Sequence, residues 1–298
     1  MKNSLTIRNA QVVLPRNIKK TDVSVKDGII NAIGSEIPDV GEVIDAESFF
    51  LIPGIIDPQV HFREPGAEHK EDLHTGSCAA AAGGVTSFLD MPNNYPPITT
   101  RILMAEKKQL AAEKSIVNYG FFIGATPDNL EELNTVENVC GIKIFMGAST
   151  GDLLVDDPET IESIFAKGTK LIAVHSEDES ILQANRILMK DINDVRIHSR
   201  IRDESAALSS TKLATRLSLK YNRRLHILHL TTAEECDLLR TLPREHQIST
   251  EVCPQHLVLT SPECYENLGT KAQMNPPIRS KRHKDALWQA LKDGIIDC

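Results

Sequence analysis

Short apolar runs alternate with longer amphipathic segments from about residue 54 to the last residue. The apolar runs are rich in Val, Ile, Leu and Phe, which is typical of strands buried on both faces. The segments between them carry apolar residues at helical spacing. Together these repeats predict a parallel sheet covered by helices. The predicted strands span residues 54–62, 85–91, 117–125, 141–147, 170–177, 225–231 and 248–254. The predicted helices span 70–83, 100–114, 157–168, 199–221 and 231–245.

Seven such strands in one run favour a TIM-like (β/α) barrel over an open doubly wound sheet. A further helix around 286–292 ends near Gly294, and Ile295–Cys298 then starts an eighth apolar run. We therefore expect an α/β fold whose barrel is incomplete at strand 8, in a chain that is truncated at its C-terminus. Such a barrel leaves two sheet edges unpaired, so the chain by itself is expected to be weakly active or inactive and prone to aggregate.

The first 52 residues follow a different pattern, in which apolar and polar positions alternate between turns. This alternation predicts short half-buried strands, and Lys26-Asp27-Gly28 predicts a hairpin turn between two of them. We place the domain boundary after residue 52, so that residues 1–52 form a small all-β part and residues 53–298 form the barrel.

Composition limits the partners and the cellular compartment that we expect for the protein. The net charge of −8 disfavours a nucleic-acid partner, although one local arginine can still bind a small anion. No apolar stretch approaches the roughly 20 residues of a membrane span, and the N-terminus lacks an apolar signal core. The six cysteines include no C-x-x-C pair, which is typical of reduced thiols. We expect a cytoplasmic protein with no nucleic-acid or membrane partner, and a homodimer is compatible with these features.

Active residues of a β/α barrel gather at the carboxyl ends of its strands. Three histidines, His61, His175 and His229, follow the first, fifth and sixth barrel strands. A lone histidine at a strand end is usually a hydrogen-bonded structural residue, but three at one end of a barrel indicate a site for a zinc-like ion. His226 is expected on the opposite face from His229. Surface positions are expected for five others: His69, His74, His198, His246 and His283.

Lys143 lies among Ile142, Ile144 and Phe145 in the fourth barrel strand. A buried lysine tends to lose its proton, and a neutral amine can react with carbon dioxide to give a carbamate whose two oxygens can bridge two metal ions. The alternative is a lysine that extends out of the barrel mouth to keep its charge in water. Strand position leaves both interpretations open.

Arg63 and Asn93 are candidates for binding a substrate carboxylate, and Asn275 adds another amide near the same barrel mouth. An arginine fork binds a carboxylate with two hydrogen bonds, and an asparagine amide adds a neutral donor. The structural alternatives are a surface salt bridge for Arg63 and turn chemistry for both asparagines, which lie in Pro- and Asn-rich segments.

Six segments, taken in order, resemble dihydroorotase of the cyclic amidohydrolase superfamily. They are HFREPG (61–66), GGVTSFLDMPNN (83–94), GIKIFMG (141–147), AVHSED (173–178), ILHLTTAE (227–234) and MNPPIR (274–279). The resemblance implies that the N-terminal strands are part of a small β-sandwich. It also implies reversible ring closure of N-carbamoyl-L-aspartate to (S)-dihydroorotate, a step of pyrimidine biosynthesis.

The resemblance also implies a role for each matching residue. His61 would bind the more buried of one or two zinc ions, the carbamate of Lys143 would bridge the metals, and His175 and His229 would hold the second. Arg63, Asn93 and Asn275 would bind the substrate. The general base of this family is an aspartate at the end of strand 8, which is expected just beyond Cys298, so no catalytic residue is assigned within the chain.

One position departs from the pattern, because Gln59 stands where the family usually has the first histidine of His-x-His. A glutamine carbonyl is a weaker metal ligand than imidazole. Two alternatives therefore stay open. One is a hydantoinase, dihydropyrimidinase or allantoinase, although the first two have no need of a carboxylate clamp such as Arg63 with Asn93. The other is a non-catalytic structural partner, for instance of aspartate carbamoyltransferase.

Overall fold

The computed structural model describes residues 4–149, 153–243 and 245–298. The chain divides into two compact units, Met1–Ile55 and Ile56–Cys298. Within the described residues no helix combines the length and the apolar composition that crossing a membrane requires.

The N-terminal unit is one mixed sheet with strand order β3-β2-β1-β4, and β5 also pairs with β1. Asp27 (φ 53°) and Gly28 (φ 81°) form a tight turn between the antiparallel strands β2 and β3, which confirms the predicted hairpin. The buried apolar residues described in this unit are a small cluster of Ala10, Val12 and Val23. The strands are β1 (Leu5–Val13), β2 (Ile18–Lys26), β3 (Ile29–Gly34), β4 (Glu42–Asp45) and β5 (Phe50–Leu51).

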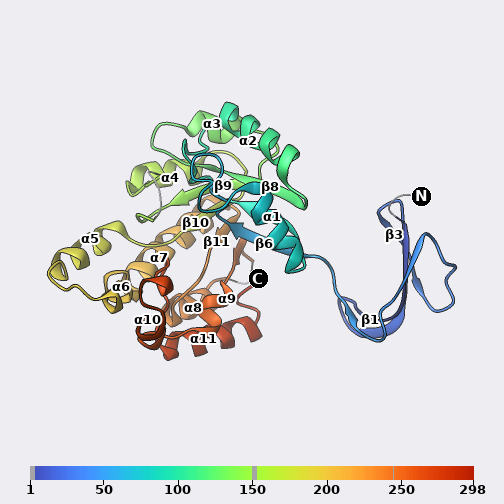
Figure 1. The fold of residues 1–298 in the computed structure, drawn as a ribbon. Coiled ribbons are helices and arrows are strands. Elements are labelled where there is room, and N and C mark those ends of the chain that lie inside the picture. Colours follow the sequence, from blue (N-terminus) through green and yellow to red (C-terminus); the bar gives the residue numbers. More distant parts are fainter. Residues whose placement is uncertain (1–3, 150–152, 244) are drawn as a thin grey trace. The chain divides into compact units, whose positions relative to one another are not determined.

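The second unit contains a seven-stranded sheet in which every strand lies beside its neighbours in chain order (Figure 1). Each predicted barrel strand overlaps one observed strand, and the sheet with its helices confirms the predicted TIM-like, incomplete barrel. The strands are β6 (Ile55–Val60), β7 (Val85–Asp90), β8 (Asn118–Gly124), β9 (Gly141–Phe145), β10 (Ile172–His175), β11 (Leu225–Ile227) and β12 (Ile248–Thr250).

Alternate residues of these strands belong to different cores. Ile142 and Ile144 of β9 pack in the large core between the sheet and the helices. Ala173 of β10 belongs to a smaller cluster with Met91 and Phe122, on the opposite, inner face of the sheet. Ala173 is the register partner of Lys143, so Lys143 also faces inward.

Side-chain caps set where most of the long helices begin. An Asp or Thr at the end of a preceding loop accepts a backbone N–H of the first turn in α1, α2, α4, α5, α7 and α8. The helices are α1 (Leu73–Ala82), α2 (Arg101–Lys114), α3 (Leu130–Thr135), α4 (Pro158–Ala166), α5 (Glu179–Leu188), α6 (His198–Ile201), α7 (Glu204–Tyr221), α8 (Ala233–Arg240), α9 (Pro254–Val258), α10 (Glu263–Leu268) and α11 (Lys281–Lys292).

The prediction of a single helix over residues 199–221 is wrong. Asp203 caps α7 by accepting the N–H of Ala206 at 2.9 Å, and Arg202 before it leaves the helical conformation (φ −98°, ψ 64°). The segment therefore forms two helices, and the break carries Arg202 into the interior, where only 4% of it is exposed.

The last residues of the chain lie beside β12, where the eighth strand was expected to begin. Asp297 donates its N–H to the carbonyl of Thr250 at 3.1 Å, and Val252 donates to the carbonyl of Cys298 at 2.9 Å.

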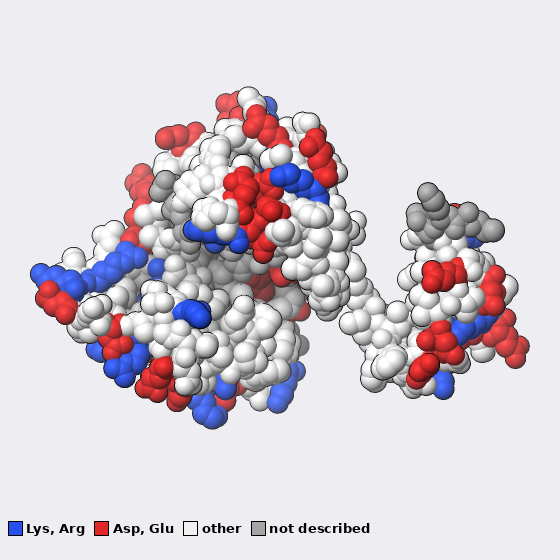
Figure 2. Space-filling view, in the orientation of Figure 1, with Lys and Arg blue, Asp and Glu red and all other residues white. Residues whose placement is uncertain are grey.

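On the face of the barrel unit in Figure 2, basic and acidic side chains are interspersed.

Candidate active site

A cavity of about 570 Å³ opens at the carboxyl ends of the barrel strands, and four predicted site residues line it: His61, Arg63, His229 and Asn275. His61 and Arg63 follow β6, whereas His229 follows β11. Residues after β12 complete the wall, with Cys253 and Gln255 at the start of α9 and Asn275 in a loop further along. The fold thus brings residues more than two hundred positions apart to one cavity, which is the candidate active site.

Lys143 is completely buried, so the alternative in which it extends to solvent is wrong. Its Nζ has no hydrogen-bond partner among the described residues and lies 4.5 Å from the centre of the Phe145 ring. Burial lowers the pKa of Lys143 to about 7, although the nearby charge of Glu251 opposes that shift. A substantial share of this amine is therefore neutral at neutral pH and available as a nucleophile.

His175 and His229 are in direct contact, with 3.1 Å between His175 Nδ1 and His229 Nε2. The other nitrogen of His175, Nε2, lies 2.7 Å from Glu177 Oε2, and Arg202 forms an ion pair with the same carboxylate. Burial lowers the pKa of both histidines. Two neutral imidazoles with facing nitrogens, one of them oriented by a carboxylate, form an arrangement typical of zinc ligands.

Glu177 was not anticipated from the sequence, although it lies only two residues after His175. Burial by itself would raise the pKa of Glu177, but His175 and Arg202 lower it to about 2. Its carboxylate is therefore ionised and accepts a hydrogen bond from His175 Nε2, so the lone pair that a metal would take lies on Nδ1, the nitrogen that faces His229.

His61 is oriented by a second predicted residue, since its Nδ1 lies 2.7 Å from Asn93 Oδ1. Burial and the nearby Arg63 lower the pKa of His61 to about 3, so the ring is neutral. Asn93 is 4% exposed and, among the described residues, is not part of the cavity lining. The structure thus places Asn93 behind His61.

The four predicted metal ligands converge, but not tightly. His175 contacts His229, His61 lines the same cavity as His229, and the charge of Lys143 contributes to the lowered pKa of all three histidines. The three histidines nevertheless do not form a group in which all ligand atoms lie within 4.8 Å; among the described residues only His226, Glu251 and Cys298 do so.

Two buried polar atoms of the barrel strands, one on β6 and one on β9, are available to a bound group. In the described part of the chain, the side-chain oxygen of Gln59 is buried and has no hydrogen-bond partner. The same is true of Lys143 Nζ. Buried polar atoms normally have partners, so an ion or water is the expected complement. The imidazoles, the Gln59 oxygen and the Lys143 position therefore fit the zinc that the family resemblance implies.

His229 has a left-handed backbone conformation (φ 40°), which is uncommon for a residue other than glycine. Its N–H donates to Glu251 Oε1 at 3.2 Å, and the other oxygen of that carboxylate lies 3.0 Å from His226 Nε2. Glu251 thus stabilises the turn that directs His229 at His175. The pattern of apolar residues contains no signal for this contact.

Several histidine assignments need correction. His198 lines the candidate site and His283 is 5% exposed, so the surface positions expected for these two are wrong. His226 does not face away from the site, because it is the register partner of inward-facing Ala173. The strand alternation does not extend to His229, which lies beyond the end of β11. His256, on α9, is also buried and influences the pKa of His229.

The loops that carry Arg63 and Asn93 are joined by a buried network that the sequence did not indicate. Lys107 of α2 lies 2.6 Å from Asp90 Oδ2 and donates to Asn94 Oδ1 at 2.6 Å. Asn94 in turn donates to the carbonyls of Phe62 and Glu64. A single lysine thus holds the segments on either side of Arg63.

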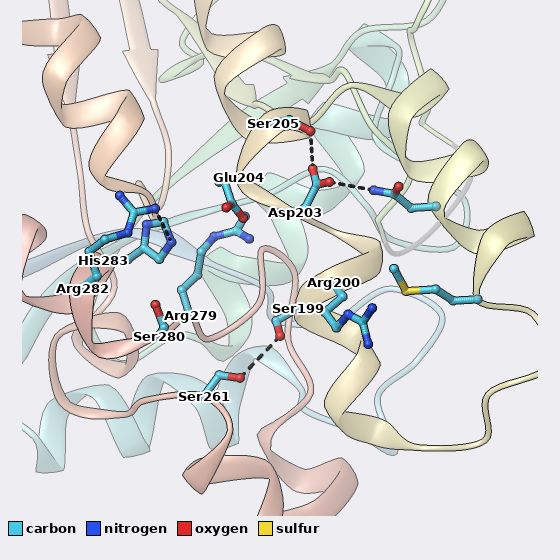
Figure 3. Close-up of a pocket in the computed structure, with 12 residues that line it drawn as sticks. Ser199, Arg200, Asp203, Glu204, Ser205, Ser261, Arg279, Ser280, Arg282 and His283 are labelled. Atoms are coloured by element: carbon cyan, nitrogen blue, oxygen red, sulfur yellow. Dashed lines mark hydrogen bonds between the residues drawn. The ribbon is translucent and has the colours of Figure 1, made fainter.

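A second cavity, of about 560 Å³, lies among α5, α6, α7 and the start of α11 (Figure 3). Arg200, Asp203 and Arg279 line it, and Figure 3 shows the Asp203 carboxylate hydrogen-bonded to Ser205. None of the predicted site residues lines it, so the candidate active site is the first cavity.

Comparison with known proteins gives a consistent result. Residues 50–297 match the model of the amidohydrolase family. The chain is 36% identical to a dihydroorotase of Methanosarcina acetivorans, over 98% of this chain and 65% of that protein. It is 34% identical to an allantoinase of Streptomyces avermitilis, over 99% of this chain and 68% of that protein. It therefore spans about two thirds of the length of these relatives.

Solved structures agree with the sequence relatives. The L-hydantoinase (dihydropyrimidinase) of Arthrobacter aurescens superposes with a TM-score of 0.94 at 27% identity, over 99% of this chain and 68% of that one. A D-hydantoinase superposes with a TM-score of 0.86 at 28% identity, over 98% of this chain and 67% of that one.

Proposed function

Because this chain belongs to the amidohydrolase family, we propose that it is the metal-binding part of a cyclic amide hydrolase and that its substrate is dihydroorotate. The reaction is the reversible interconversion of N-carbamoyl-L-aspartate and (S)-dihydroorotate in pyrimidine biosynthesis. Relatives at similar identity are named dihydroorotase and allantoinase, so the choice between these substrates depends on the cavity.

The environment of Arg63 supports the choice of dihydroorotate as the substrate. Its side chain lines the cavity, and its guanidinium has no hydrogen bond or ion pair within the described residues. A partly buried, unengaged guanidinium favours a ligand with a carboxylate. Dihydroorotate carries one, whereas dihydrouracil and allantoin do not. Asn275 lines the same cavity and adds an amide donor.

The proposed metal ligands are His61, His175, His229 and the carbamate of Lys143, with one or two zinc ions. A zinc ion held by these residues would lower the pKa of bound water and polarise the ring carbonyl. Asn93 and Glu177 orient the imidazoles of His61 and His175 through the contacts described above. Arg63 and Asn275 fix the carboxylate so that the ring amide points to the metal ligands.

Substitution of Arg63 by methionine tests the substrate. We expect KM for dihydroorotate to rise about 30- to 150-fold, the equivalent of about 2–3 kcal/mol for a charged hydrogen-bonded pair that loses one partner. Steady-state kinetics on a form of the protein that turns over dihydroorotate gives the value. Hydrolysis of dihydrouracil and allantoin by the same variant is the control and should change little. An unchanged KM for dihydroorotate, or a parent enzyme that prefers dihydrouracil, would refute the assignment.

Metal loading should depend on pH and on bicarbonate. A carbamate forms only on a neutral amine, and with a pKa of about 7 the neutral share of Lys143 rises steeply from pH 6 to pH 8. Burial lowers the pKa of all three histidines, which favours their neutral, metal-binding form over the same range. We expect zinc retained after dialysis to increase several-fold between pH 6 and pH 8 when bicarbonate is present. Elemental analysis measures it, and equal retention without bicarbonate would count against the carbamate.

A non-catalytic role as a structural partner of aspartate carbamoyltransferase is the second candidate, and Gln59 is the residue that favours it. A chain that holds no metal at any pH and still binds the transferase would replace the hydrolase proposal with this one.

A further inference from the structure

A second group of metal-ligand side chains joins two buried residues, His226 and Glu251, with the exposed Cys298. His226, Glu251 and Cys298 each offer one ligand atom, and these atoms all lie within 4.8 Å of one another. His226 and Glu251 are buried, with 8% and 3% exposure. None of the three belongs to the ligand set of the proposed function.

The sheet register explains why these residues meet. His226 is paired with Ala173 on one side and with Ser249 on the other, and Ala173 packs in the inner cluster. Register partners in a parallel sheet point to the same face, so His226 and Ser249 both face inward. Glu251 follows Ser249 by two residues and shares that face. Backbone hydrogen bonds beside β12 bring Cys298 next to it.

We propose that His226, Glu251 and Cys298 form a separate site for a zinc-like divalent cation. Imidazole nitrogen, carboxylate oxygen and thiolate sulfur are the three ligand types that zinc prefers. With bonds of 2.0–2.3 Å, ligand atoms around a tetrahedral zinc lie about 3.3–3.8 Å apart, so the observed group needs only small side-chain movements. Three protein ligands leave a fourth position for water.

The hydrogen bonds around the group suit this role. His226 Nδ1 lies 2.8 Å from Ser249 Oγ, and a hydrogen bond at one ring nitrogen leaves the other, Nε2, available to a metal. The two carboxylate oxygens of Glu251 have different partners. Oε1 accepts the N–H of His229, and Oε2 faces His226. A cation can therefore take the place of the proton between His226 and Glu251 without disturbing the contact to His229.

The shared carboxylate links this site to the candidate active site. Glu251 holds the backbone of His229 in its left-handed conformation, so a cation that immobilises Glu251 also immobilises the turn that directs His229. The inferred site stands on its own contacts and does not require the proposed function.

Cobalt titration of the metal-free 298-residue chain tests the site, because a thiolate bound to Co²⁺ gives a charge-transfer absorption in the near ultraviolet. We expect this absorption to saturate at about one equivalent per chain. Cys298→Ser should abolish it, and His226→Gln should weaken Co²⁺ binding at least about tenfold. The control Cys253→Ser removes a neighbouring thiol that is outside the group and should leave the absorption unchanged.

The Lys143→Met variant separates this proposal from the proposed function. The absorption should persist in Lys143→Met, even where that variant has lost the metal of the candidate active site. Absence of a thiolate absorption in the parent chain, or an equal absorption in Cys298→Ser, would overturn the inference and leave His226 and Glu251 as a hydrogen-bonded pair. If Cys298→Ser does not fold, an unchanged Co²⁺ affinity in His226→Gln overturns it equally.

Discussion

Replacement of Lys143 by methionine is expected to abolish metal binding at the candidate active site and to lower hydrolase activity at least about 1000-fold. Loss of the metal forfeits several kcal/mol of transition-state stabilisation, and each 1.36 kcal/mol corresponds to a factor of ten. Methionine has nearly the volume of lysine but offers no nitrogen to carbamylate. Elemental analysis and the rate of dihydroorotate hydrolysis, measured in a form of the protein that has this activity, give the two results.

The same variant should be at least as stable as the parent when both are free of metal and carbon dioxide. Lys143 is buried without a hydrogen bond in the described structure, and its pKa falls from 10.5 to about 7 on folding. The unfolded chain therefore binds more protons than the native chain between about pH 7 and pH 10.5, so the penalty for burying Lys143 is full below pH 7 and disappears as the pH rises. Chemical denaturation at pH 6 and pH 10 should show the advantage of methionine only at pH 6.

This combination distinguishes a functional lysine from a structural one. A Lys143→Met chain that loses stability at pH 6 would indicate that the amine has a structural partner. Lys143→Ala offers a second test, because a short carboxylic acid can occupy the space and restore metal and activity if the carbamate is the native ligand. A variant that keeps its metal at the candidate site would refute the role of Lys143.

Replacement of Lys107 by methionine is expected to destabilise the protein by about 3–5 kcal/mol. Lys107 and Asp90 form an ion pair in which neither side chain is more than 1% exposed. Without the ammonium group, the Asp90 carboxylate remains buried and unpaired, and Asn94 loses a donor. Urea denaturation measures the change. Because the network holds the segments beside Arg63, KM for dihydroorotate should rise as well.

Lys108 supplies the matched control. It is the next residue on α2, is partly exposed, and among the described residues its side chain donates to the carbonyl of Glu137 at 3.1 Å. Lys108→Met should change stability by no more than about 0.5 kcal/mol. Adding Asp90→Asn to Lys107→Met should recover part of the loss, because the asparagine oxygen can still accept the N–H of Phe62 without a buried charge. Equal effects of the two lysine variants would show that the buried pair contributes nothing.

The barrel was predictable because its strands are buried on both faces. Runs such as residues 141–147 have few polar residues, and such a run can be recognised from the sequence without knowledge of the tertiary structure. Four helices were not predicted: α3, α9 and α10 have only 6, 5 and 6 residues, whereas α5 has 10 residues with an amphipathic pattern and was overlooked. The break at Arg202 was missed because an N-cap aspartate inside a helical pattern becomes visible only when its side chain bonds the backbone.

For the candidate site too, some features could be predicted from the sequence and others could not. Barrel geometry places strand ends together, so the proximity of His61, Lys143, His175 and His229 followed from their positions in the sequence. The roles assigned to these residues stay predictions. Their partners did not follow, since Glu251, Arg202 and Lys107 contact the site from other strands, loops or helices, at sequence distances that no local pattern encodes.

The sequence by itself determined the order and kind of the barrel elements and which polar side chains end the strands. Only the tertiary structure decided that the Lys143 amine is buried without a hydrogen-bond partner among the described residues, that His229 turns at positive φ onto the Glu251 carboxylate, and that His226 faces the barrel interior. The physical reason is that apolar periodicity is a property of neighbouring residues, whereas burial, charge pairing and backbone strain depend on which distant groups the fold brings within a few ångströms.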